Sequence, residues 1–219
     1  MKRAELARVI DHSVLKPEAT ALDIEAGAQV VREWRVGFYC VQPCWVPLAH
    51  EALADAVAQV IAVIGFPHGC ERSAVKVRAT ELAIDDGARE IDMVINLGAL
   101  RSGDLATVAD DIAAVVDAAR GIPVKTIIEA SALGDEQKRL ACRIAVDSGA
   151  AFVKTSTGFH ASGGATVADV RLMRDVVGPD IGVKASGGIR TLDDAKAMLA
   201  AGANRIGASA TAAILAALR

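Results

Sequence analysis

The chain has 219 residues, of which 53% are hydrophobic and 23% are charged, and its formal net charge is −3. A chain of this length can bury one large core, so residues 1–219 are expected to form a single domain. Since no run of Lys and Arg stands out, nothing indicates a nucleic-acid or anionic-membrane partner, and small-molecule chemistry is expected.

The N-terminal segment and the cysteines predict a cytoplasmic protein. Residues 1–8 alternate charged and apolar side chains and lack the apolar core, about 7 to 15 residues long, of a signal peptide. No apolar run is long enough to predict a membrane-spanning helix. The four cysteines are too few for a disulfide framework and lack the paired CxxC spacing of a zinc site. We therefore expect reduced thiols and no metal.

Short apolar runs recur along the chain, each followed by a longer segment. The runs are residues 9–15, 37–41, 60–65, 91–96, 124–129, 151–159, 181–190 and 205–209. Helix start signals are followed by a stop signal in residues 20–34, 104–121, 135–149, 166–179 and 191–202. Eight repeats of strand then helix in about 220 residues predict a compact (β/α)₈ TIM barrel of the α/β class.

The sixth run places Lys154 inside the apolar stretch Ala-Phe-Val-Lys and follows it with Thr-Ser-Thr-Gly. This pattern is typical of a buried strand that ends in a loop. Burial lowers the pKa of an amine, and a neutral amine can attack a carbonyl to form a Schiff base. The alternative is a lysine at a strand end whose head group reaches water.

A second lysine, Lys184, repeats the pattern of strand, lysine, hydroxyl and glycine thirty residues later. Thirty residues correspond to about one strand-helix-strand unit, so the two strands are expected to be parallel neighbours. Lys154 and Lys184 would then point into the same space, and each positive charge would make the other easier to deprotonate. This pairing favours the catalytic interpretation.

Side-chain alternation along the strands adds a carboxylate to the two lysines. If Ile91 and Met93 face the helices, Asp92 faces the barrel interior, as Lys154 and Lys184 do from their strands. The three side chains form either a buried ion pair that serves packing alone or a catalytic set. In the catalytic set, Lys154 forms the imine, Lys184 lowers the pKa of Lys154, and both Asp92 and Lys184 are candidate proton donors or acceptors.

Glycine-rich turns after the last strands indicate a phosphate site. Loops after strands seven and eight, with backbone N–H groups at a helix N-terminus, are the usual phosphate cradle of a TIM barrel. Gly158, in the turn after Lys154 of strand six, is expected to add a further backbone N–H donor. The candidate phosphate-binding residues are Gly158, Gly187, Gly188, Gly207 and Ser209.

Other polar residues are weaker candidates. Lys125 and Glu129 share one face of the fifth strand and are either an ion pair lining the barrel or part of the site. Asp11 and Lys16, at the end of the first strand, are placed to order the substrate end of the barrel. The Gly-Phe-Pro-His-Gly turn at residues 65–69 is expected to shape a loop rather than carry chemistry. Surface or loop roles are expected for the histidines, which lack metal-ligand spacing: His12, His50, His68 and His160.

These motifs together resemble the deoxyribose-phosphate aldolases, a family of class I aldolases with the (β/α)₈ fold. The resemblance covers nearly the whole chain, and its most specific parts are the two lysine segments and their order relative to Ile-Asp-Met-Val-Ile-Asn. It runs through residues 11–17, 63–69, 90–96, 152–159, 183–190 and 205–209. The chain departs from the family pattern in two loops, residues 42–45 and 160–162, which bear on substrate entry rather than on imine chemistry.

The resemblance implies reversible cleavage of 2-deoxy-D-ribose 5-phosphate to D-glyceraldehyde 3-phosphate and acetaldehyde, in deoxyribonucleoside catabolism. It implies that Lys154 forms the Schiff base and that Asp92 and Lys184 donate or accept protons. The expected partners are a sugar phosphate and an aldehyde, with no cofactor, and a homodimer or larger homo-oligomer is expected. Two alternatives stay open: a class I aldolase acting on another phosphorylated sugar, and a non-catalytic barrel that binds phosphorylated metabolites.

Overall fold

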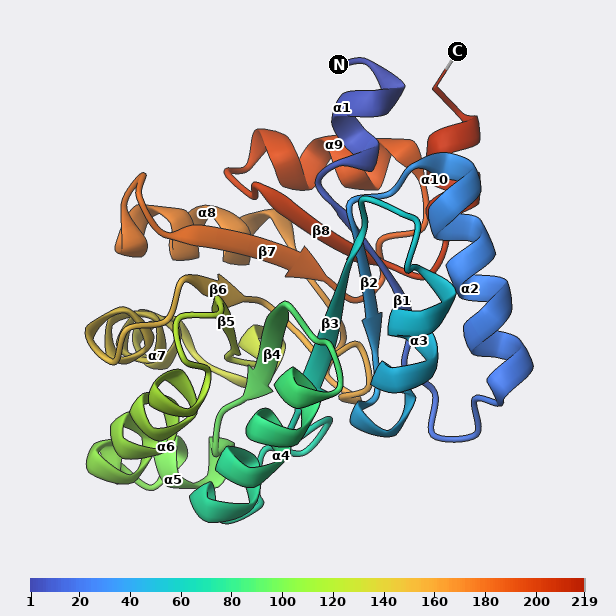
Figure 1. Ribbon diagram of the computed structural model, residues 1–219. Coiled ribbons are helices and arrows are strands. Elements are labelled where there is room, and N and C mark those ends of the chain that lie inside the picture. The colour runs from blue at the N-terminus through green and yellow to red at the C-terminus, as the bar shows by residue number, and fades with distance from the viewer. Residues whose placement is uncertain (219) are drawn as a thin grey trace.

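The structure is a computed structural model that describes residues 1–218, and its eight parallel strands close into a barrel in chain order (Figure 1). The predicted (β/α)₈ fold is confirmed. The strands are β1 (Ile10–Val14), β2 (Phe38–Val41), β3 (Gln59–Ile64), β4 (Glu90–Val94), β5 (Val124–Ile127), β6 (Phe152–Lys154), β7 (Gly182–Ser186) and β8 (Arg205–Ala208). Most are shorter than the apolar runs that predicted them, because the last residues of those runs form the loops of the carboxyl end.

Helices surround the barrel (Figure 1). They are α1 (Arg3–Ala7), α2 (Ala21–Trp34), α3 (Val46–Ala52), α4 (Ser73–Asp85), α5 (Leu97–Arg101), α6 (Leu105–Ala118), α7 (Asp135–Asp147), α8 (Val167–Val177), α9 (Leu192–Ala200) and α10 (Thr211–Ala216), with 3₁₀ turns η1 (Pro43–Trp45) and η2 (Ala130–Ala132). The side chains of Thr20, Thr166 and Thr191 cap α2, α8 and α9 at the predicted positions. Helices α3 and α4, which the sequence analysis did not assign, carry no side-chain cap.

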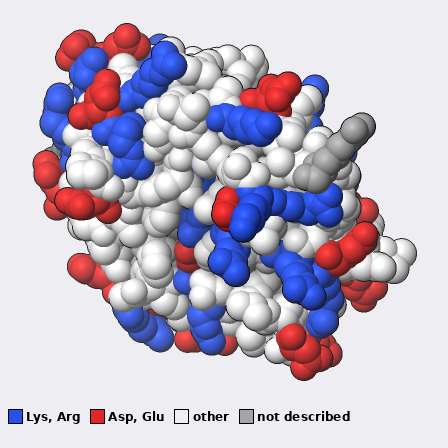
Figure 2. All heavy atoms as spheres, turned by 90° about the horizontal axis from the view of Figure 1, so that it is seen from above, with Lys and Arg blue, Asp and Glu red and all other residues white. Residues whose placement is uncertain are grey.

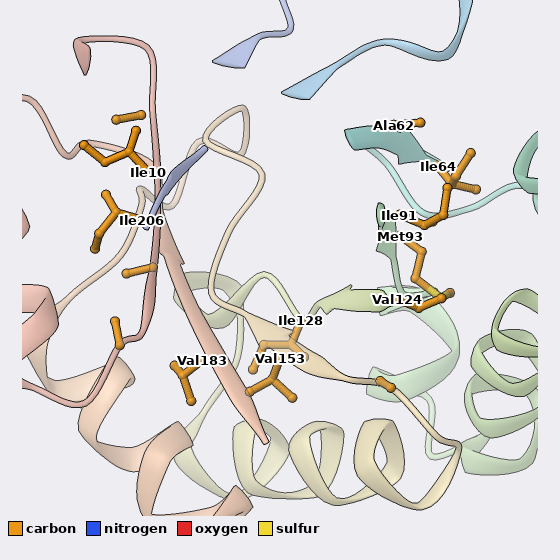
Figure 3. Close-up of a cluster of buried hydrophobic side chains, with 14 of the residues drawn as sticks. Ile10, Ala62, Ile64, Ile91, Met93, Val124, Ile128, Val153, Val183 and Ile206 are labelled. Carbon is orange, nitrogen blue, oxygen red and sulfur yellow. The ribbon is translucent and has the colours of Figure 1, made fainter. Parts of the chain in front are cut away.

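The main hydrophobic core lies between the strands and the helices. Ile91 and Met93 of β4 are fully buried in this layer, while Asp92 between them faces the barrel interior, as alternation along a strand requires. Figure 3 shows labelled members of the layer, with Val153 and Val183 on the side of the helices. A smaller cluster inside the barrel contains Cys40, Ile61 and Val63. The interior is thus shared between a few apolar side chains and buried charges.

The two ends of the barrel differ. At the amino end of the strands, α1 packs its buried Leu6 and Ala7 against the barrel, and the Ala7 carbonyl accepts a hydrogen bond from the Gly37 N–H at the start of β2. Arg3 also donates to the Leu218 carbonyl, so α1 lies beside the last described residues of the chain (Figure 1). The carboxyl end of the barrel is open and holds the cavity described below.

Charged side chains of both signs are interspersed on the face shown in Figure 2. Within residues 1–218, no helix combines the length and the apolar composition that crossing a bilayer requires.

Candidate active site

A cavity of about 780 Å³ opens at the carboxyl ends of the strands. This is the end where TIM-barrel enzymes bind their substrates. Both lysines and all five candidate phosphate-binding residues line it: Lys154, Lys184, Gly158, Gly187, Gly188, Gly207 and Ser209. Asp92 is fully buried and contacts both lysines from below. The structure therefore brings together the three catalytic candidates and the five phosphate-binding candidates of the sequence analysis.

Asp92 is the centre of the polar cluster. Strand register pairs Lys154 with Lys184 on neighbouring strands, and Asp92 reaches them from β4. The Asp92 Oδ2 atom lies 2.6 Å from the Nζ atom of Lys154 and 2.6 Å from the Nζ atom of Lys184. The other carboxylate oxygen, Oδ1, accepts a hydrogen bond from Lys125 Nζ at 2.9 Å. The carboxylate of Asp92 thus forms ion pairs with three ammonium groups.

Burial and charge give the two cavity lysines different acid-base behaviour. Burial lowers the pKa of Lys154, and the charge of Lys184 lowers it further, against the opposing pull of Asp92. Burial by itself would also lower the pKa of Lys184. The carboxylates of Asp11 and Asp92 outweigh burial, so the pKa of Lys184 is raised. The expected effect of a neighbouring lysine is thus seen at Lys154, whereas at Lys184 the two carboxylates decide the direction of the shift.

The carboxylates of the cluster stay ionised. Burial alone would raise the pKa of Asp92, but the ammonium groups of Lys125, Lys154 and Lys184 outweigh burial and hold that pKa well below its usual range. The pKa of Asp11 is lowered in the same way, chiefly by Lys184. Of the two cavity lysines, Lys154 therefore holds its proton less tightly, beside an anionic Asp92 and a Lys184 whose pKa is raised.

Three further charged residues extend the cluster. The sequence analysis missed Glu90 and Arg205 and left the role of Lys125 undecided. Arg205 bonds to Asp11 Oδ1 at 3.0 Å and to both carboxylate oxygens of Glu90, at 3.0 and 3.1 Å. Glu90 also contacts Lys125 Nζ at 2.5 Å. The available signal was side-chain alternation, because Glu90 lies two residues before Asp92 on β4 and Arg205 lies two residues before Gly207 on β8.

Lys125 and Glu129 do not form the ion pair that was one of the two alternatives for them. Lys125 pairs with Glu90 and Asp92. Glu129 has left-handed backbone geometry, with φ of 51°, which turns it out of the β5 alternation. Its carboxylate accepts hydrogen bonds from the backbone N–H of Thr157, at 3.2 Å, and from the Thr157 hydroxyl, at 2.5 Å. Glu129 thereby holds the loop that follows Lys154.

The glycines of the proposed phosphate cradle pack against one another. A Cβ atom on Gly187 would lie 2.9 Å from the Cα atom of Gly164 and 3.2 Å from that of Gly158. A Cβ atom on Gly207 would lie 3.1 Å from Cε of Lys184. The loops after β6 and β7 can approach this closely only because Gly158, Gly164 and Gly187 lack side chains, and Gly207 of β8 leaves room for the side chain of Lys184. Their backbone is thereby brought to the cavity wall.

Side chains at the cavity rim complete the site. Lys16 and Arg190 line the cavity and are exposed. Phe159 packs edge-on against Phe66 of the 65–69 loop, with ring centroids 5.3 Å apart, so this loop shapes the rim as expected.

Neither the histidines nor the cysteines form a metal site. His12 contacts Thr211 Oγ1 through Nδ1 at 2.9 Å, and burial lowers its pKa to about 4. In the described part of the chain, no three His, Cys, Asp or Glu side chains are placed to hold a metal ion together. All four cysteines are free thiols, and burial raises the pKa of Cys40 to about 11.

Comparison with known proteins identifies the family of this chain. The family model of the DeoC/LacD family aldolases matches residues 6–217. The chain belongs to the DeoC/LacD aldolase family. It is 55% identical over 212 residues to deoxyribose-phosphate aldolase 1 of Bacillus licheniformis, covering 96% of this chain and 95% of that relative. Solved structures similar to this chain include a tetrameric deoxyribose phosphate aldolase from Aeropyrum pernix, with a TM-score of 0.92 and 30% identity over 99% of this chain and 92% of that one.

A second relative lies at a similar distance within this aldolase family. The deoxyribose-phosphate aldolase of Enterococcus faecalis is 52% identical over 212 residues, covering 96% of each chain. The family resemblance inferred from the motifs is confirmed.

Proposed function

We propose that the protein is a class I aldolase that reversibly cleaves 2-deoxy-D-ribose 5-phosphate to D-glyceraldehyde 3-phosphate and acetaldehyde. The observation that carries the proposal is the buried amine of Lys154, whose pKa is lowered and which lies 2.6 Å from the Asp92 carboxylate at the floor of an open cavity. Membership of an aldolase family and the names of two relatives more than 50% identical support the same substrate.

In the proposed cleavage, Lys154 is the nucleophile. Its neutral amine attacks the C1 aldehyde of the open-chain sugar, and loss of water gives a protonated imine. Removal of the proton from the C3 hydroxyl allows the C2–C3 bond to break, and its electron pair moves toward the imine nitrogen to give an enamine. D-glyceraldehyde 3-phosphate leaves at this step. A proton then adds to C2, and water hydrolyses the imine to release acetaldehyde and the free amine.

Asp92 and Lys184 are the proposed proton donors and acceptors of this sequence. Both lie within hydrogen-bond distance of the same reacting region, since Asp92 Oδ2 contacts the Nζ atoms of Lys154 and Lys184 equally. Lys184 keeps its proton because Asp11 and Asp92 raise its pKa, so it is suited to stabilise or protonate a developing alkoxide. All atoms and electrons balance with water and protons alone, so the proposal includes no cofactor.

The loops after β6, β7 and β8 are the proposed phosphate site. The backbone of Gly158, Gly187, Gly188 and Gly207, together with Ser209, would face the phosphate, as N–H groups and hydroxyls do in TIM-barrel phosphate sites. Exposed Arg190 on the same wall supplies a positive charge. A substrate with phosphate at this wall would present its other end toward Lys154.

The assembly and cellular location are further parts of the proposal. The Aeropyrum pernix relative is tetrameric, which supports a homo-oligomer here, and sedimentation equilibrium measures the state directly. The cytoplasm stays the predicted location.

Trapping with borohydride tests the proposed reaction. Incubation with acetaldehyde and borohydride should leave one ethyl group on Lys154, which peptide mapping locates, because reduction of the imine makes it permanent. Lys154→Ala should abolish both the adduct and aldol cleavage, with an unchanged circular dichroism spectrum. Absence of an adduct, or ethyl groups spread over surface lysines, would favour the non-catalytic binding barrel. If Lys154 is trapped, cleavage assays with a panel of phosphorylated sugars separate the stated substrate from the other aldolase alternative.

A further inference from the structure

The barrel interior contains more buried positive than negative side chains. Four cations and three carboxylates form one connected network, in which every member contacts another at 3.1 Å or less: Lys125, Lys154, Lys184, Arg205, Asp11, Glu90 and Asp92. Each member is at most 8% exposed. Since unpaired buried charge is costly, the network is most stable when one of its four cations gives up its proton.

Contacts within the network decide which cation that is. Lys184 pairs with Asp11 and Asp92, Lys125 pairs with Glu90 and Asp92, and Arg205 pairs with Asp11 and Glu90. Among the described residues, Lys154 contacts a single carboxylate, Asp92, and shares the same oxygen with Lys184. Lys154 is therefore the cation that loses its proton most readily.

Lys125 and Glu90 have no place in the proposed reaction and do not line the cavity. Lys125 occupies Oδ1 of Asp92, which leaves Oδ2 for the two cavity lysines. Glu90 ties Lys125 to Arg205, whose guanidinium lies 3.5 Å from the ring centroid of Phe38. Lys125 thus fixes the orientation of Asp92. Together, Lys125 and Glu90 also contribute one positive and one negative charge to its surroundings.

We propose that Lys125 and Glu90 are positioning residues that act through Asp92 and set the charge balance that makes Lys154 a nucleophile. The proposal deepens the aldolase function and rests on it. The charged and titratable groups that face Lys154 are Asp92 from β4, Lys184 from β7 and Cys40 from β2, with Asp11, Glu90, Lys125 and Arg205 in the layer connected to them. The Cys40 thiol, with its pKa at about 11, stays neutral near pH 7.

Two substitutions should shift the reaction in opposite directions. Lys125→Met removes one cation, so Lys154 should keep its proton to higher pH. Glu90→Gln removes one anion at nearly constant shape, so Lys154 should lose its proton at lower pH. The rate at which cyanoborohydride traps acetaldehyde on Lys154 is measured from pH 5 to pH 9. The readout is the midpoint of this pH profile, the pH at which the rate is half of its maximum. Each midpoint should move by about one pH unit, the size expected for one charge nearby in a protein interior.

Lys76→Met is the matched control for removing a buried lysine. Lys76 is 1% exposed, pairs with Asp111 at 2.5 Å and donates a hydrogen bond to the Val94 carbonyl of β4. It forms no ion pair with a member of the network, so its loss removes the ion-pair partner of a buried carboxylate while the charge count of the network stays the same. This variant should be destabilised yet keep the wild-type midpoint. Lys125→Arg keeps the positive charge and should also keep a midpoint close to wild type, which preserves the test if Lys125→Met fails to fold.

The outcomes separate this proposal from the function it rests on. If wild-type Lys154 is not trapped, the aldolase proposal fails. If wild type is trapped but the folded charge variants shift in the same direction, or keep the wild-type midpoint while only losing stability, Lys125 and Glu90 are structural and the inference is overturned. A higher midpoint for Lys125→Met together with a lower midpoint for Glu90→Gln supports the inference, because a loss of packing alone cannot move the two midpoints in opposite directions.

Discussion

Lys154 and Lys184 are the same kind of side chain, adjacent in strand register and almost equally buried. Their pKa values nevertheless move in opposite directions, because Lys184 touches two carboxylates and Lys154 shares one. The sequence indicated that both lysines are special, since each follows an apolar run and precedes hydroxyls and glycine. It could not assign the difference, which depends on Asp11 at the other end of the chain.

His12 offers a test of burial at a single residue. Its pKa is lowered to about 4 by burial, whereas the unfolded chain takes up a proton near pH 6.5. As pH falls below about 6.5, protonation therefore favours the unfolded state, and stability is lost until pH reaches about 4. The free energy of unfolding in urea should fall by about 2 kcal/mol more between pH 7 and pH 5 in wild type than in His12→Asn.

His160→Asn is the control for that measurement, since His160 is exposed and pairs only locally with Ser162. It should keep the wild-type pH dependence. An equal pH dependence in wild type and His12→Asn would contradict the assigned burial effect.

The loops after β6 and β7 show how elements build the proposed phosphate site. Gly187 adopts a positive φ of 86° and packs on Gly164 and Gly158, and Glu129 anchors the Thr157 end of the same loop. The sequence indicated glycine-rich turns at these places. It named Glu129 only beside Lys125 and could not indicate the contact of Glu129 with Thr157, because the left-handed backbone of Glu129 breaks the alternation that a strand pattern assumes.

Gly187→Ala should weaken binding of the sugar phosphate with little change in the turnover of bound substrate. Its new Cβ atom would meet the backbone of Gly164 at 2.9 Å and push the two loops apart. We expect KM to rise by about tenfold, the equivalent of about 1.4 kcal/mol, and kcat to stay within about twofold. Steady-state kinetics with 2-deoxy-D-ribose 5-phosphate measure both.

Gly163→Ala is the matched control, because Gly163 also has a positive φ, of 111°, but a Cβ atom there would meet nothing within 4 Å. Its KM should stay near the wild-type value. Equal effects of the two substitutions would assign the loss to backbone strain rather than to the close approach of the loops.

The whole molecule separates stability from chemistry along the barrel axis. The cavity opens at the carboxyl ends of the strands, while α1 packs against the amino ends with Leu6 fully buried. Such a division is general in TIM barrels, where side chains at the amino end serve folding. Substitutions at this end should therefore change stability and leave the reaction alone.

Leu6→Ala should lower the free energy of unfolding by about 3 kcal/mol, because it leaves a cavity under α1. The values of kcat and KM of the folded fraction should stay within about twofold of wild type. Urea unfolding and steady-state kinetics on the same preparation measure the two properties. Leu22→Ala removes the same atoms from a residue that is 75% exposed, and its stability should stay within about 0.5 kcal/mol of wild type. A fall in kcat for Leu6→Ala would show that the two ends are coupled.

The sequence by itself determined the fold and the three central side chains. Eight apolar runs with recurring helix signals predict the barrel, and alternation along a strand sends Asp92 inward, because both patterns are local and repeat within a few residues. Only the tertiary structure decided the network around them. Asp11, Glu90 and Arg205 come from three strands distant in sequence, and whether each contacts a given lysine depends on how the closed barrel brings those strands to one interior. The charge on Lys154 is therefore a property of the closed barrel, since it is set by distances between groups that no local pattern relates.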